Sequence, residues 1–209
     1  FLPSASDHEK SISEMGILNT DRIIIYCYSD LISSCRAWFQ FLYFGHNPKL
    51  VSVLNGGMKK WKLEKKKVTS KKTKIIPSKY ISKENKNMIK IKSEVDKNIK
   101  EKKFTILDAR NKNRFLGLES EPRPGIKSGS IKGSKSLPLS ELINIKNNTF
   151  LSKEKLKNIF NSKEIRSNEI VMSCGSSVSA SSLALAYSII NDDYMAKIYI
   201  GSWAEHGKK

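Results

Sequence analysis

The sequence predicts a doubly wound α/β protein with two similar domains, each built on a central parallel sheet. Short apolar segments alternate with segments of helical spacing, as is typical of parallel strands joined through helices. The order strand, loop, helix, strand and glycine turn occurs twice, with an offset of about 145 residues. Cys174 in the second copy takes the place of Tyr28 in the first, and Gly201 takes that of Gly56. The repeat indicates two homologous domains, of which only the second has a cysteine in its loop.

The composition is that of an ordinary globular protein apart from its charge. Hydrophobic residues make up 39% of the chain, and no apolar run approaches the about 18 residues that a membrane-spanning helix needs. The net charge of +18 comes mainly from lysines, which are concentrated in residues 59–103. This stretch has no arginine and few of the aromatic residues on which bases stack. We therefore expect no nucleic acid and no membrane as partner, but a positive field that favours a small anionic substrate.

The cysteines argue against a disulfide framework. Cys27, Cys35 and Cys174 are odd in number and form no CxxC pair, which also argues against a zinc site and favours a reducing, cytoplasmic compartment. Cys27 stands one position before the place that aligns with Cys174, and Cys35 lies in a helical segment, so we expect both in the core. The histidines lack the spacing of metal ligands and are expected in packing or on the surface: His8, His46 and His206.

The first domain is expected within residues 1–64. A polar helical pattern in Ser6–Met15 precedes Asp21–Tyr26, which reads as a buried strand. Ser34–Phe44 has the spacing of a helix and is followed by a glycine. Leu50–Leu54 reads as a second strand that enters a turn of asparagine and two glycines. Two such strands joined through a helix are expected to pair in parallel.

Residues 65–85 are expected to form a lysine-rich, solvated linker, and residues 86–209 the second domain. Within the linker we expect a short strand at Thr73–Ile76. In the second domain we expect a helix at Asn87–Ile99 and a strand that ends at Asp108. Further helices are expected at Leu139–Ile145 and Lys153–Phe160, the latter with Ser152 as its N-cap.

The stretch Asn168–Ile190 combines an apolar strand, a loop of small residues and an alanine- and serine-rich helix. Its cysteine, Cys174, stands where the strand enters the loop. The unpaired N–H groups and the dipole of a helix N-terminus attract anions. A cysteine at such a loop is favoured as the nucleophilic thiolate. The alternative interpretation is a small buried cysteine in a core strand.

Four segments around this loop resemble the tandem-domain sulfurtransferases, the rhodaneses and mercaptopyruvate sulfurtransferases. They are Asp108-Ala109-Arg110, Arg114-Phe115 with Glu121-Pro122-Arg123, Cys174-Gly175-Ser176, and Lys197–Gly207. The resemblance implies two rhodanese-like domains, an inactive one in residues 1–64 and a catalytic one in residues 86–209. The first residues, Phe1-Leu2-Pro3, match a place within the family's first domain. We therefore expect that domain to be incomplete at its N-terminus, as in a truncated chain.

The resemblance also assigns roles to single residues. Cys174 corresponds to the nucleophile that carries a persulfide, and Ser176 to a serine that relays a proton. Arg114 and Arg123 correspond to the arginines that bind the substrate carboxylate, for which the guanidinium fork is well suited. The loop amides are expected to hold the substrate and the persulfide, and they belong to Gly175, Ser176, Ser177, Val178 and Ser179. Asp108 and Arg110 are expected mainly to brace the fold.

The loop residues favour one donor over another. Mercaptopyruvate-type loops are neutral after the cysteine, whereas thiosulfate-type loops carry basic residues, and this loop has none. Ser177 and Ser179 depart from the glycine and threonine of the mercaptopyruvate type. A Cβ at position 177 is unfavourable if this position requires a positive φ.

We therefore expect a sulfurtransferase that moves sulfur from 3-mercaptopyruvate through a Cys174 persulfide to a thiol, thioredoxin-like or cyanide acceptor, with release of pyruvate. No metal or organic cofactor is needed for this reaction. Two alternatives stay open, namely a thiosulfate:cyanide sulfurtransferase and a non-catalytic rhodanese-like binding module. A cysteine phosphatase needs an arginine six positions after the cysteine to hold the phosphoryl oxygens. Ala180 stands there, which excludes that class.

Overall fold

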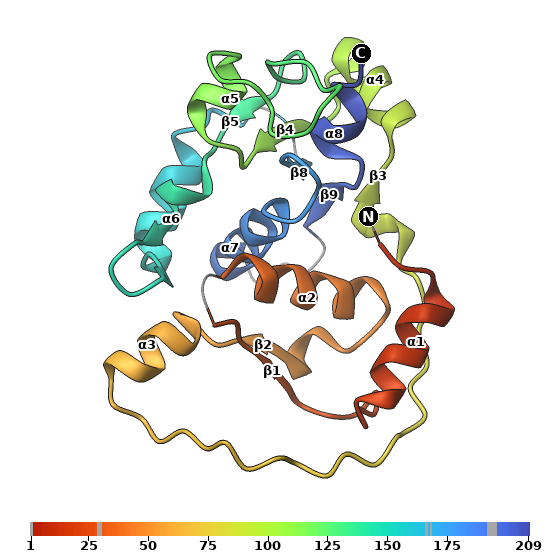
Figure 1. Ribbon diagram of the computed structural model, residues 1–209. Coiled ribbons are helices and arrows are strands. Elements are labelled where there is room, and N and C mark those ends of the chain that lie inside the picture. The colour runs from red at the N-terminus through yellow and green to blue at the C-terminus, as the bar shows by residue number, and fades with distance from the viewer. Residues whose placement is uncertain (1, 29–30, 166, 168, 192–195) are drawn as a thin grey trace.

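The fold has two parallel sheets with a pair of packed helices between them, in a computed structural model that describes residues 2–28, 31–165, 167, 169–191 and 196–209. A two-stranded sheet and a five-stranded sheet lie at opposite sides of helices α2 (Ile32–Tyr43) and α7 (Ala180–Asn191) (Figure 1). The predicted doubly wound α/β class with a central parallel sheet is confirmed.

The first domain contains the two helices and the two strands that the sequence predicts, of which the strands are shorter than expected, and also a helix, α3 (Gly57–Leu63), that was not predicted. Its elements are α1 (Ala5–Glu14), β1 (Ile23–Ile25), α2, a 3-10 turn (Pro48–Leu50), β2 (Val51–Val53) and α3. Strands β1 and β2 pair in parallel, with Ile24 opposite Ser52. The expectation of a buried first strand is wrong, because Ile24 is 61% exposed and Tyr26 is 59% exposed. One face of this small sheet packs on α2, and the other face is open.

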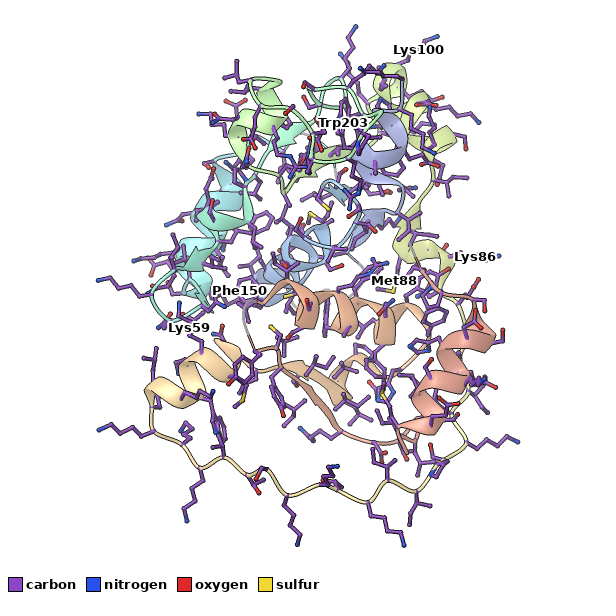
Figure 2. All side chains as sticks on the ribbon, in the orientation of Figure 1. Lys59, Lys86, Met88, Lys100, Phe150 and Trp203 are labelled. Atoms are coloured by element: carbon purple, nitrogen blue, oxygen red, sulfur yellow. The ribbon has the colours of Figure 1, made fainter. Side chains whose placement is uncertain are left out.

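The lysine-rich segment between the domains is extended, and its second part is tied to the first domain. Residues 64–77 are exposed, and the expected strand at Thr73–Ile76 is absent. The lysine side chains of this segment point outward in Figure 2. Tyr80 is fully buried, and its hydroxyl lies 3.0 Å from Nδ1 of His46. The prediction of a solvated linker over residues 65–85 is therefore wrong at Tyr80, which packs among aromatic rings of the first domain.

The second domain holds the five-stranded parallel sheet, in the order β3-β9-β8-β4-β5. Its strands are β3 (Ile89–Lys90), β4 (Thr105–Asp108), β5 (Lys135–Ser136), β8 (Ile170–Ser173) and β9 (Lys197–Tyr199). Its helices are α4 (Lys92–Glu101), α5 (Lys112–Leu116), α6 (Lys153–Asn161), α7 and α8 (Ser202–His206). A 3-10 turn (Lys86–Met88) precedes β3. An antiparallel pair, β6 (Ile143–Asn144) and β7 (Thr149–Phe150), precedes α6.

Two predicted helices of this domain need correction. The segment Asn87–Ile99 is not one helix, because Ile89 and Lys90 pair with β9 and α4 begins only after them. The segment Leu139–Ile145 is a 3-10 turn (Leu139–Glu141) followed by β6. In both cases a neighbouring strand offers the backbone a partner that local spacing does not reveal. The helix at α6 is confirmed, and Ser152 accepts the N–H of Lys155 as its cap.

Helices α2 and α7 join the two domains into one hydrophobic core. Helix α2 is buried nearly all round, as expected of a helix that is apolar on most sides. Its Trp38 and Phe39 belong to the same core cluster as Met172 of β8 and Leu183 of α7. The loop that leads into α7 therefore lies over the boundary between the domains. In the part of the chain that the structure describes, no helix has the length and apolarity to cross a membrane.

Candidate functional site

Cys174 lies at the carboxyl end of the central strand β8, beside the end of β4. Asp108 and Ser173 are opposite each other in the parallel ladder, so the two strands end at the same edge of the sheet. Doubly wound sheets bind their ligands outside this edge. The predicted order of strand, loop and helix is confirmed, although Asn168, where that stretch begins, lies outside the described residues.

A cavity of about 530 Å³ opens above Cys174. It is lined by four of the five loop residues after the cysteine, by both predicted arginines, and by Ile32 at the start of α2. Cys174 itself is 1% exposed, so its sulfur is shielded from bulk water. The cavity therefore brings together most of the predicted site residues: Cys174, Gly175, Ser176, Val178, Ser179, Arg114 and Arg123.

The first turn of α8 fixes the start of the cysteine loop. The N–H of Trp203 donates to the Cys174 carbonyl at 2.9 Å, and the N–H of Ala204 donates to the Gly175 carbonyl at 2.8 Å. In a planar trans peptide the N–H points away from its carbonyl. Because both carbonyls point toward α8, the N–H groups of Gly175 and Ser176 point the opposite way. Neither N–H has an acceptor among the described residues, and both residues line the cavity.

Ser202 is a second anchor of the loop, and sequence reasoning missed it. Its Oγ accepts the N–H of Cys174 at 3.3 Å and that of Ser177 at 3.0 Å, and it donates to the Tyr199 carbonyl at 2.9 Å. The Ser177 amide is thus not available to an anion. This one buried hydroxyl therefore links the two ends of the segment Cys174–Ser177.

Ser177 is placed below the cavity and not in its wall. It is fully buried and has a φ of 62°. The position therefore has the positive φ at which a Cβ is unfavourable. Only glycine adopts such a conformation without strain from a Cβ. Of the predicted substrate-binding residues, Ser177 is the one that the structure keeps out of the cavity lining.

The two predicted arginines lie over the first glycine of the loop. A Cβ built on Gly175 would lie 3.3 Å from Nη2 of Arg114 and 3.5 Å from Nη1 of Arg123. A Cβ at this position would require Arg114 to move by a few tenths of an ångström and would touch Arg123 at ordinary van der Waals distance. Arg123 also donates through Nη2 to Oγ of Ser176 at 3.0 Å. Both cations therefore stand at the mouth of the cavity and beside the residue that follows Cys174.

Glu121 orients Arg114, a role that sequence reasoning did not assign to it. Its carboxylate accepts Nε of Arg114 at 3.1 Å and Nη2 at 2.5 Å, and it also accepts Nη1 of Arg110 at 2.7 Å. Burial acts to raise the pKa of Glu121, but the hydrogen bonds from the two arginines outweigh it and hold the pKa below its usual range. The signal in the sequence was its place two residues before Arg123.

Asp108 and Arg110 brace the end of β4, as expected. Arg110 donates Nη2 to Oδ2 of Asp108 at 2.7 Å, and its guanidinium carbon lies 4.9 Å from the ring of Trp203 in α8. Both charged side chains are 1% exposed. This pair joins the strand end, Glu121 and α8 into one buried network beneath the arginines of the cavity.

Arg36 reaches the loop from the first domain, and sequence reasoning did not consider it. It is 9% exposed, and its Nη1 lies 3.4 Å from both the carbonyl oxygen and Oγ of Ser177. Burial lowers the pKa of its guanidinium, and negative charge on Cys174 opposes this effect. The available signal was a lone charge inside an otherwise apolar helical segment.

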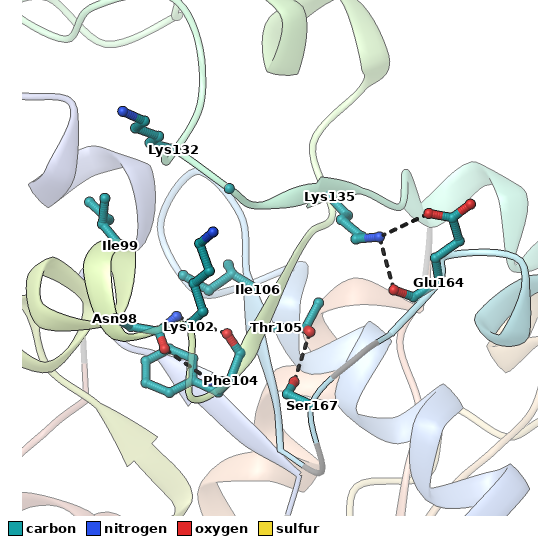
Figure 3. Close-up of a pocket in the computed structure, with 11 residues that line it drawn as sticks. Asn98, Ile99, Lys102, Phe104, Thr105, Ile106, Lys132, Lys135, Glu164 and Ser167 are labelled. Carbon is teal, nitrogen blue, oxygen red and sulfur yellow. Dashed lines mark hydrogen bonds and ion pairs between the residues drawn. The ribbon is translucent and has the colours of Figure 1, made fainter.

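A second cavity, of about 420 Å³, lies at the opposite end of β4 (Figure 3). Its polar groups are largely satisfied by one another. Asn98 bonds the backbone of Phe104, and Thr105 lies 2.8 Å from Ser167 through their hydroxyls. Its lining residues include no cysteine and no arginine. This cavity therefore lacks the residue types that the sequence predicts for the site.

Cys35 and two of the histidines are packed in the core, whereas Cys27 is not part of it. Cys35 is fully buried in the core, as predicted. Cys27 is half-buried, so its placement in the core needs correction. His8 and His46 are buried among aromatic rings, and His8 stacks on Phe44 at 4.1 Å between ring centroids.

The repeated parallel fold places a shielded cysteine beside loop amides and two arginines, an arrangement that suits group transfer at a thiol. The profile of the rhodanese-like domain family matches residues 2–64 and 92–208. The chain belongs to this family, with its two-domain architecture.

The relatives of this chain are sulfurtransferases. It is 33% identical to mouse "Thiosulfate sulfurtransferase" and 32% identical to human "3-mercaptopyruvate sulfurtransferase", in each case over 98% of this chain and 69% of the relative. The crystal structure of SseA from Escherichia coli, described as a 3-mercaptopyruvate sulfotransferase, matches with a TM-score of 0.83 and 26% identity. That match covers 97% of this chain and 74% of SseA. Sulfurtransferase activity is what these matches support, and they do not distinguish between the two donors.

Proposed function

We propose that the chain transfers sulfur from 3-mercaptopyruvate through a persulfide on Cys174 to a thiol, thioredoxin-like or cyanide acceptor, with release of pyruvate. The observation that carries this proposal is that the positive charge of the cavity lies on side chains outside the cysteine loop. The loop residues are neutral, and the cations of the cavity mouth are Arg114 and Arg123, side by side over Gly175. This arrangement suits a donor with its carboxylate at one end and its sulfur at the other.

The donor carboxylate is proposed to bind between the two arginines. Glu121 occupies Nε and Nη2 of Arg114, which fixes the plane of the guanidinium. Nη1 of Arg114 has no acceptor among the described residues, and neither has Nη1 of Arg123. Fixed guanidinium groups with free N–H donors bind carboxylate with little loss of conformational entropy.

In the first step the Cys174 thiolate attacks the sulfur of the donor. A bond forms between the two sulfur atoms, the carbon–sulfur bond breaks, and its electron pair leaves as the enolate of pyruvate. The Ser176 hydroxyl, which accepts a hydrogen bond from the cation Arg123, is proposed to give a proton to this enolate and to take up the thiol proton of the transferred sulfur, so that pyruvate leaves and an anionic persulfide remains on Cys174. The free N–H groups of Gly175 and Ser176 stabilise the anionic persulfide.

In the second step the acceptor attacks the outer sulfur. The sulfur–sulfur bond breaks and its electron pair returns to Cys174, so the thiolate is regenerated. A cytoplasmic location for this reaction stays a prediction. So does the alternative that thiosulfate is the donor, since its sulfonate is also an anion that two arginines can bind.

The test is release of pyruvate from 3-mercaptopyruvate with a thiol acceptor, compared with thiocyanate formation from thiosulfate and cyanide. We expect pyruvate release with the larger kcat/KM and its loss in Cys174→Ser. A larger kcat/KM with thiosulfate contradicts the choice of donor. Silence in both assays contradicts the catalytic role and favours a binding module.

A further inference from the structure

Ser177 has an unfavourable backbone conformation that its surroundings impose. It is a non-glycine residue at φ 62°, and it is fully buried. Its N–H donates to Ser202, and its carbonyl accepts Oγ of Ser181 at 3.2 Å and Nη1 of Arg36 at 3.4 Å. Such conformations persist only where several contacts enforce them, and they are concentrated at functional sites.

The direction of the Ser177 carbonyl decides where the next amide points. The carbonyl oxygen of Ser177 and the N–H of Val178 belong to one planar peptide and point in opposite directions. The carbonyl points toward Arg36, on the side of the first domain. The N–H of Val178 therefore points away from Arg36, has no acceptor among the described residues, and belongs to a residue that lines the cavity.

The contact with Arg36 comes from the other domain and involves two atoms of Ser177. Nη1 lies 3.4 Å from the carbonyl oxygen and 3.4 Å from Oγ. Helix α2, which carries Arg36, packs directly on α7, which begins three residues after Ser177. The packing of α2 on α7 therefore fixes the position of the Arg36 guanidinium relative to the loop.

We propose that Arg36 is a positioning residue for the cysteine loop. It holds the peptide between Ser177 and Val178 in the orientation that presents the Val178 N–H to the cavity, and in this way the first domain completes the site of the second. Its kinetic consequence rests on the proposed function, whereas its effect on the loop does not.

Hydrogen–deuterium exchange of the full chain tests the effect on the loop, with Arg36→Gln as the variant. We expect exchange in the peptide that spans Cys174–Ser182 to rise about tenfold while β4 keeps its protection. Arg22→Gln is the matched control, since Arg22 is an exposed arginine of the same domain. It is expected to leave the loop unchanged. Unchanged exchange of the loop in a folded Arg36→Gln protein overturns the proposal.

The kinetic readout separates positioning from a merely structural role. We expect kcat for sulfur transfer to fall about tenfold or more in Arg36→Gln, with KM within about twofold, because a loop that is slightly misplaced binds the donor but reacts slowly. Arg36→Lys is expected to restore part of kcat, because it keeps the charge but not the fork. A rise in KM alone overturns the assignment.

A second variant keeps the test valid if Arg36→Gln does not fold. Ser177→Ala removes the hydroxyl that Nη1 contacts and keeps the Cβ, and its loop is expected to exchange faster as well. Combined with Arg36→Lys, its effect is expected to be less than additive, since both changes disturb the contact between Nη1 of Arg36 and Oγ of Ser177. Full additivity overturns the proposal. If the native chain transfers no sulfur but the loop loosens in the variants, the proposed function fails and this inference stands.

Discussion

The contacts of Arg123 predict that replacing its guanidinium with an ammonium group lowers the affinity for the donor. Arg123 is a fork held by the Ser176 hydroxyl, and lysine supplies a single point charge in its place. We expect Arg123→Lys to raise KM for 3-mercaptopyruvate about tenfold with kcat changed less than about threefold, because lysine keeps a positive charge beside Ser176 and the carboxylate takes no part in the bonds that form and break at sulfur.

Steady-state kinetics of pyruvate release measure this effect. Lys127→Gln is the matched control, because Lys127 is an exposed cation of the same loop that does not line the cavity. A fall in kcat without a change in KM contradicts the role of Arg123 in binding the carboxylate.

His8 makes the stability of the first domain sensitive to acid. Burial lowers the pKa of His8 from 6.5 to about 4. As the pH falls below 6.5 the unfolded chain takes up a proton that the folded chain refuses until about pH 4. Stability is therefore full above about pH 6.5 and declines toward pH 4, by about 3 kcal/mol in total from this residue.

Urea unfolding at a series of pH values tests this prediction. His8→Phe keeps an aromatic ring against Phe44 and removes the titrating group, so its free energy of unfolding is expected to change less between pH 6.5 and 4. An equal decline in both proteins contradicts the assignment to His8.

The sequence predicts the residues that are proposed to react and to bind the donor, but not those that hold them in place. Cys174, Arg114 and Arg123 stand in short motifs whose spacing is visible along the chain. Arg36 contacts a residue 141 positions away, and Ser202 bonds an amide 25 positions away. Contacts of this kind depend on tertiary packing, and a single sequence shows only that a charge or a hydroxyl is present.

At the scale of elements, the end of β4 is held by a buried ionic network. Arg110 bonds two carboxylates, Asp108 and Glu121, which are 1% and 2% exposed at their side chains. Removal of one partner from such a network leaves uncompensated buried charge. We expect Arg110→Met to lower the free energy of unfolding by about 3–5 kcal/mol.

Urea denaturation measures this loss. Lys60→Met is the matched control, because Lys60 pairs with Glu64 on the exposed surface of α3. Exposed pairs contribute little, and we expect no resolved change in the control. A similar small effect in both variants contradicts the role of Arg110 as a brace.

Elements with clear spacing were predicted well, but the two-residue strand β3 was not. Helix α2 has a long apolar pattern, and strand β8 has an uninterrupted apolar run, and these patterns indicate their type. Strand β3 has only two residues, and they lie within a segment whose apolar residues also suit a helix. Their pairing with β9 decides the outcome, and β9 lies more than a hundred residues later in the chain.

At the scale of the whole molecule, the two domains share one core. Helix α2 contributes aromatic side chains that pack with residues of β8 and α7. The site depends on this arrangement, since Ile32 lines the cavity and Arg36 contacts the loop. Neither domain buries its apolar helix face alone.

The exposed residues 64–77 have a consequence for limited proteolysis. Every residue of this stretch is exposed, many are lysines, and trypsin cleaves after lysine. We expect brief trypsin treatment to cut here first and give two fragments. Because the interface between them is a hydrophobic core, we expect the fragments to elute together in gel filtration without denaturant.

Separation of the fragments would show that the covalent connection is needed to hold the domains together. Co-elution would mean that the nicked protein behaves as a non-covalent heterodimer. In that case each half can be produced separately, and mixing the two halves is expected to restore the proposed sulfur transfer at Cys174.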